Sequence, residues 1–117
     1  QNYVIKAKVG AALSSVASLK TAVGLCAQET GGILTDCDTG SNGIPTFTAT
    51  KELAAATAVV NGAINAVFAP GIGVGIDNLG MTLTPVVGSS NIVWTGGATS
   101  GLPVTNAIAL DLITKNN

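Results

Sequence analysis

Cys26 and Cys37 are the residues of this chain whose chemistry is easiest to recognise, because they are its only cysteines. They do not match a zinc site, since such a site needs four ligands and the sequence contains no histidine. Two free thiols are one alternative. A disulfide is favoured, because Cys26 falls at the end of a predicted helix and Cys37 lies among turn formers. Such a bond would stabilise the fold by about 3 kcal/mol and indicates a periplasmic or extracellular protein.

No other group of residues predicts a reactive site. The absence of histidine and arginine excludes Ser-His-Asp and Cys-His nucleophiles. Residues 36–40 begin like a calcium loop, but Ser41 and Phe47 occupy the positions that need glycine and glutamate. Residues 71–77 resemble half of a calcium-binding repeat. The pattern occurs only once, whereas such sites are made by stacked repeats, so we predict a flexible connector here. We therefore expect no catalytic residue, no cofactor and no metal.

The composition predicts one folded domain with a weakly charged surface. A chain of 117 residues can form a single hydrophobic core, and 47% hydrophobic residues exclude intrinsic disorder. Only 9% of the residues are charged, with a net charge of −1 and no basic cluster, so nucleic acid would bind at most weakly. A surface this poor in charge favours contact with other protein subunits. No run of about 18 apolar residues is present, which argues against a membrane-spanning segment in this chain.

Residues 1–28 are predicted to form one long amphipathic helix. Apolar residues recur at alternating steps of four and three, so they share one side of a helix. They are Ile5, Val9, Ala12, Val16, Leu19, Val23 and Cys26. The opening Gln1-Asn2-Tyr3 contains no initiating methionine, signal peptide or capping box. We interpret residues 1–28 as the downstream part of a longer helix whose upstream part has been removed.

Asn61 and Gly62 predict a hairpin between two strands at residues 58–60 and 63–68. Asn-Gly is the preferred pair for a two-residue type I′ turn, and apolar β-branched residues flank it on both sides. The alternative is a helix over residues 50–68. Gly62 and the β-branched residues argue against that helix.

The rest of the chain is predicted to complete an antiparallel sheet. Residues 81–87 and 91–95 read as third and fourth strands, with Pro85 indicating an edge or a strand end. Residues 107–113 fit either a short helix or a last strand. Together the elements predict a single α+β domain, residues 1–117, with the helix packed on a four-stranded antiparallel meander. Its expected parts are the helix at 1–28, a loop at 29–57, the sheet at 58–95 and a C-terminal region at 96–117.

The order of these features resembles the globular part of a type IVa pilin. The resemblance rests on the opening Gln1-Asn2-Tyr3 with its lysine pair, on the cysteine-containing loop and on the Asn-Gly hairpin. Residues 80–85, 92–94 and 102–103 also resemble the third strand of the family, its strand ending in tryptophan and its C-terminal Leu-Pro. Many relatives carry a disulfide in the C-terminal loop, whereas this chain has no cysteine there. A Cys26–Cys37 bond would instead join the helix end to the following loop.

The resemblance implies a structural protein and not an enzyme. Identical subunits of the family polymerise through their N-terminal helices into a helical filament, which implies that Tyr3, Val4 and Lys6 lie near neighbouring subunits. A removed apolar segment would hold the major subunit in the inner membrane until the pilus machinery assembles an extracellular filament. Such filaments serve adhesion to host cells or abiotic surfaces, twitching motility and DNA uptake. The alternatives are a pseudopilin of a type II secretion system and a secreted ligand-binding module.

Overall fold

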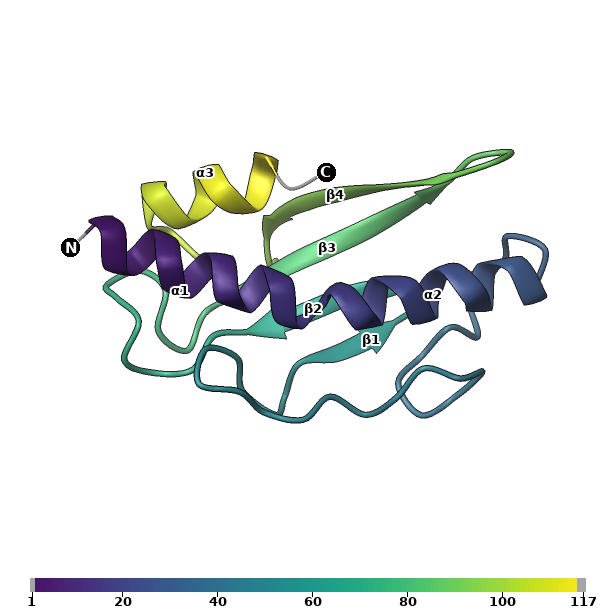
Figure 1. Ribbon diagram of the computed structural model, residues 1–117, viewed down its shortest axis with the longest axis horizontal. Helices are drawn as coiled ribbons and strands as arrows, with labels where there is room; N and C mark the ends of the chain where they lie inside the picture. The colour runs from purple at the N-terminus through teal and green to yellow at the C-terminus, as the bar shows by residue number, and fades with distance from the viewer. Residues whose placement is uncertain (1, 116–117) are drawn as a thin grey trace.

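Two consecutive helices, α1 (Asn2–Ser15) and α2 (Ala17–Glu29), run along the long axis of the computed structural model (Figure 1). The structure describes residues 2–115, and the molecule measures 44 × 25 × 24 Å. Gln1, where the helix was expected to begin, and residues 116–117 of the expected C-terminal region lie outside the described residues.

The predicted long N-terminal helix is confirmed, and it carries one break, at Val16, that the sequence analysis did not predict. The backbone dihedrals of Val16 are φ −95° and ψ 1°. The hydroxyl of Ser15 donates a hydrogen bond of 2.8 Å to the carbonyl oxygen of Ala12, the acceptor that the Val16 N–H would use in an α-helix. Serine pairs such as Ser14-Ser15 are frequent at helix kinks. The apolar stripe continues across the break, because Val16 itself is fully buried.

Within residues 2–115, four strands form one antiparallel sheet in the order β1-β2-β3-β4. The strands are β1 (Ala58–Val60), β2 (Ala63–Val67), β3 (Gly80–Val87) and β4 (Ile92–Ala98). Each strand pairs with the next one along the chain, which confirms the predicted α+β fold with a four-stranded meander. The helical rod formed by α1 and α2 covers one face of this sheet (Figure 1).

The turn between β1 and β2 has positive φ at both central residues, 51° at Asn61 and 81° at Gly62. A type I′ turn requires this conformation, which asparagine and glycine adopt most readily. Val60 pairs with Ala63 directly across the turn. The structure therefore contains a hairpin here and not the alternative helix over residues 50–68.

Strand β4 extends as far as Ala98, so the predicted end of the sheet at residue 95 was too early. Glycine has a low strand propensity, and for this reason Gly96 and Gly97 indicated a loop in the sequence. Both glycines nevertheless continue the ladder with β3, opposite Leu83 and Thr82 respectively. Pairing between strands outweighs local propensity at these positions.

The C-terminal segment forms the helix α3 (Ala107–Lys115), which settles the alternative between helix and strand. The side-chain oxygen of Asn106 accepts hydrogen bonds of 3.0 Å from the N–H groups of Ile108 and Ala109. This is an N-cap, which satisfies donors that the first turn of a helix leaves without partners. Ala109 and Ile113 are fully buried and join α3 to the core.

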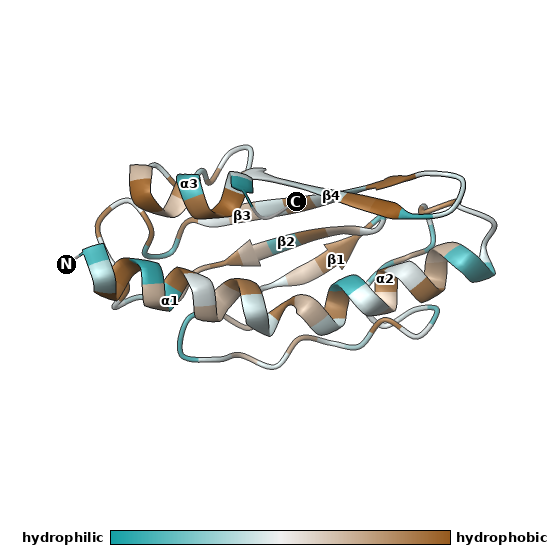
Figure 2. Ribbon diagram, turned by 45° about the horizontal axis from the view of Figure 1, so that its top comes forward, coloured by the Kyte–Doolittle hydropathy of each residue, from teal (hydrophilic) through white to brown (hydrophobic). Residues whose placement is uncertain are grey.

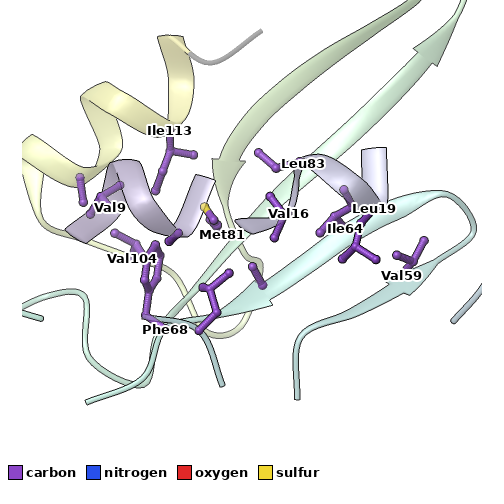
Figure 3. Close-up of a cluster of buried hydrophobic side chains, with 14 of the residues drawn as sticks. Val9, Val16, Leu19, Val59, Ile64, Phe68, Met81, Leu83, Val104 and Ile113 are labelled. Atoms are coloured by element: carbon purple, nitrogen blue, oxygen red, sulfur yellow. The ribbon is translucent and has the colours of Figure 1, made fainter. Parts of the chain in front are cut away.

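The hydrophobic core lies between the helices and the inner face of the sheet (Figure 3). Val9, Val16 and Leu19 of the helical rod point toward Met81, Leu83, Ile64 and Phe68 (Figure 3). Every member of the predicted stripe from Ile5 to Cys26 is buried. The alternation of apolar residues therefore identified the buried side of the helices correctly.

Candidate functional site

A disulfide joins Cys26, in the last turn of α2, to Cys37 in the loop that follows it. The S–S distance is 2.02 Å and the two Cα atoms lie 6.0 Å apart. Both cysteines are fully buried. Since reactive cysteines lie in exposed, electropositive surroundings, this pair serves structure and offers no surface thiol chemistry.

The loop segment at residues 36–40 covers the edge of β1. The Val59 N–H donates a hydrogen bond of 2.7 Å to Thr39 Oγ1, and the Thr39 N–H returns one of 3.0 Å to the Val59 carbonyl. Asp38 Oδ1 accepts a hydrogen bond of 2.7 Å from the Asn61 N–H. The segment that begins like a calcium loop therefore binds the sheet edge and the hairpin turn. The described residues contain no group of three or more His, Cys, Asp or Glu that could hold a metal ion.

The connector at residues 71–77, which the sequence predicted to be flexible, is closed by Asp77. Its Oδ1 atom accepts hydrogen bonds from the N–H groups of Ile72 at 2.7 Å and Gly73 at 2.9 Å. The bond from Gly73, followed by that from Ile72, lowers the pKa of Asp77, because both stabilise the carboxylate form. Lys8 Nζ also donates a hydrogen bond of 2.8 Å to the carbonyl oxygen of Gly71. The connector is thus a turn tied to α1.

The opening of α1 is an exposed surface, which we call the α1 tip and define as Tyr3, Val4 and Lys6. The side chain of Tyr3 is 90% exposed and that of Val4 is 49% exposed. Lys6 is also exposed. The structure thus brings together, in the first two turns of one helix, the three residues that the resemblance placed near neighbouring subunits.

A groove of about 680 Å³ lies at the other end of the molecule, between α2 and the tip of the β3–β4 hairpin. We call it the hairpin groove. Leu25 and Gln28 of α2 line one side, and Val87 and Ile92 of the hairpin line the other. Leu25 is 57% exposed. Figure 2 shows apolar residues on the hairpin next to its tip, alongside the end of α2.

The sequence analysis missed the hairpin groove. Its origin is the short pairing between β2 and β3, which ends where Ile64 faces Leu83. Beyond Leu83, β3 pairs only with β4, so the hairpin projects past the rest of the sheet (Figure 1). The apolar residues on both sides of the 88–91 turn were the only signal in the sequence. They could not show that the hairpin tip stands apart from the sheet.

The outer face of the sheet is uncharged and mixes polar residues with the exposed Val60, Val86 and Val93, and none of the four described strands contains a charged residue. The Thr82 hydroxyl donates a hydrogen bond of 2.9 Å to Asn65 Oδ1 and lies 2.9 Å from the Thr99 hydroxyl. Such a face can form hydrogen bonds and van der Waals contacts. It holds no acid or base for proton transfer.

The helical segment Asn2–Glu29 is long and apolar enough to cross a membrane, with a mean hydropathy of 1.4 in its most apolar stretch. The sequence analysis had expected no such segment. One helix of this kind is weak evidence for a membrane anchor, because the core helix of a soluble protein satisfies the same criteria. Here 33% of that stretch is buried inside the protein.

Comparison with known proteins adds two findings. The sequence matches the profile of the pilin family, which forms bacterial filaments, over residues 5–115. A stretch of 55 residues is 49% identical to the prepilin peptidase-dependent protein D of Escherichia coli (strain K12). This alignment covers 47% of the present chain and 37% of the relative. The matched part is thus little more than a third of that protein.

Proposed function

Because the chain belongs to the pilin family of structural filament subunits, we propose that it polymerises with identical copies into a type IV pilus. The observation that carries this proposal is the helical rod of α1 and α2. One side of the rod is buried by the protein's own sheet, while Tyr3, Val4 and Leu25 remain exposed. Exposed apolar residues near both ends of a helical rod that spans the molecule support contact with other subunits.

We also propose that residues 1–117 act as one domain in this filament, because the sheet and the three helices of residues 2–115 share one core. The α1 tip would face neighbouring subunits. The sparse charge of the chain, 9% of its residues, supports close packing of the remaining surface.

The processing and assembly of the subunit follow from the same proposal. The relative in Escherichia coli is named as dependent on prepilin peptidase, and we propose the same processing for this protein. An apolar helix would then anchor the subunit in the inner membrane. The pilus machinery would assemble it from there into an extracellular filament. Adhesion to host cells or abiotic surfaces, twitching motility and DNA uptake are the proposed uses of that filament.

Deletion of the gene, combined with electron microscopy, tests the proposal. Cells of the source organism should carry filaments that an antibody against this chain labels along their length, and the deletion should remove them. A deletion that leaves the filaments intact but stops the export of folded proteins would identify a pseudopilin of a secretion system instead. Loss of surface spreading in the deleted strain would support the role in twitching.

A further inference from the structure

We propose that the hairpin groove receives the α1 tip of a second copy of this chain, in a head-to-tail contact that continues along the filament. The inference rests on the proposed filament function and names the two surfaces that meet. The surfaces differ in chemistry and lie at opposite ends of the helical rod (Figure 1).

The groove end of the molecule carries a carboxylate without a basic partner. Glu29 lies one helical turn after Leu25 and therefore on the same side of α2. It is exposed at the C-terminal end of the helix, where a negative charge is unfavourable beside the helix dipole. Within the part of the chain that the structure describes, the one ion pair joins Lys115 to Asp111. Asp36, exposed in the following loop, adds a second acidic group after the end of α2.

The α1 tip carries the complementary groups. The ammonium group of Lys8 donates a hydrogen bond of 2.8 Å to the carbonyl oxygen of Gly71. Lys6 is therefore the exposed cation available at this end of the rod. Tyr3 and Val4 provide the apolar part beside it. The apolar residues of the groove, with Glu29 beside its lining residue Gln28 on α2, thus match an apolar tip that carries an ammonium group.

The groove is large enough to receive an aromatic side chain. Its volume of about 680 Å³ lies within the range of pockets that enclose small ligands. A tyrosine that becomes buried removes roughly 150–250 Å² from water. Leu25, Val87 and Ile92 offer apolar contacts for its ring. Because the contact area is small, we expect a weak contact in solution that becomes effective in a polymer, where each subunit has several neighbours.

The two surfaces cannot meet within one molecule. Lys6 and Glu29 are 23 positions apart on the rod, which corresponds to about 35 Å at the helical rise per residue. A contact between them must join two copies. When the two rods point the same way along the filament, each contact leaves an unused tip on one copy and an unused groove on the other, so the contact is heterologous and builds an open chain of subunits.

Zero-length cross-linking tests the contact on unmodified protein. Filaments sheared from producing cells are treated with a water-soluble carbodiimide, which joins an ammonium group to a carboxylate only when they touch. Mass spectrometry should find Lys6 linked to Glu29 or Asp36, and the link should disappear in the Lys6→Gln variant. Filaments that contain this chain but lack that link would overturn the contact and leave the proposed function intact. Absence of the chain from all filaments would overturn both.

Charge exchange provides a second test. Lys6→Glu and Glu29→Lys should each lower the yield of filaments several-fold, and the double variant should restore it, because the attraction is rebuilt with opposite signs. Lys51→Glu, at an exposed lysine in the loop before β1, is the matched control and should leave the yield unchanged. Circular dichroism of each purified variant shows whether the fold is kept. A double variant that folds but does not recover the yield contradicts the proposal.

Discussion

The backbone N–H of Gly62 donates a hydrogen bond of 2.8 Å to the carbonyl oxygen of Cys37. The turn of the first hairpin is thereby tied to the loop that the disulfide fastens to α2. The side chain of Leu34 packs on the same turn, and a Cβ atom at Gly62 would lie only 3.1 Å from its Cδ2 atom. Helix end, loop and hairpin therefore form one connected unit, although they come from three separate parts of the sequence.

Replacing Gly62 by valine should destabilise the protein by more than about 1 kcal/mol. Valine rarely adopts the φ of 81° found here, and its Cβ would press against Leu34. Urea denaturation of both proteins measures the difference in the free energy of unfolding. Gly43→Val is the matched control, because Gly43 has φ 80° but no atom within 4 Å of an added Cβ. Equal losses in the two variants would argue against the contact with Leu34.

Removing the disulfide should lower the free energy of unfolding by about 3 kcal/mol, the value that the chain-entropy model gives for a short closed loop. The comparison is between the native protein and the double variant Cys26→Ser/Cys37→Ser, by thermal unfolding. Alkylation of the folded native protein should label no cysteine, since the two sulfur atoms are bonded to each other. Two labelled thiols in folded protein would contradict this assignment.

Gly96→Ala should destabilise the contact between β4 and α3, whereas Gly97→Ala should not. A Cβ at Gly96 would collide with the carbonyl oxygen of Ile113, while one at Gly97 meets no atom within 4 Å. Overpacking of this kind costs roughly 1–3 kcal/mol. Hydrogen exchange of the α3 amides should therefore accelerate in the first variant alone. Similar exchange in both variants would show that α3 moves aside at little cost.

Asp77 should make the stability of the protein depend on pH in the acid range. Hydrogen bonds from Gly73 and Ile72 lower the pKa of its carboxyl group in the folded protein, whereas the unfolded chain has the ordinary value of about 3.9. This contribution is present above the unfolded value and is lost as the pH falls through the lower, folded pKa. The Asp77→Asn variant keeps the side-chain oxygen and loses the charge. Wild type should be the more stable protein near neutral pH, and the gap should shrink in acid; a constant gap would contradict the assignment.

The local features of the sequence were sufficient for the long N-terminal helix with its buried side and for the first hairpin. The apolar stripe from Ile5 to Cys26 depends on a spacing that one helix face imposes, and the Asn61-Gly62 turn depends on two backbone conformations. The order of these elements also carried the resemblance to pilins. Each of these signals lies within a short segment, where residues influence one another directly through the chain.

Contacts between distant segments determined the remaining features. Gly96 and Gly97 belong to β4 because β3 pairs with them, and Asn106 caps a helix whose buried side fits the core. The hairpin groove exists because β2 ends opposite Leu83 while β3 and β4 continue. Strand length and register depend on partners far away in the sequence, so a pattern within one strand cannot specify them. The sequence thus determined which side of the N-terminal helix is buried, and the tertiary structure decided where the sheet stops and what it leaves exposed.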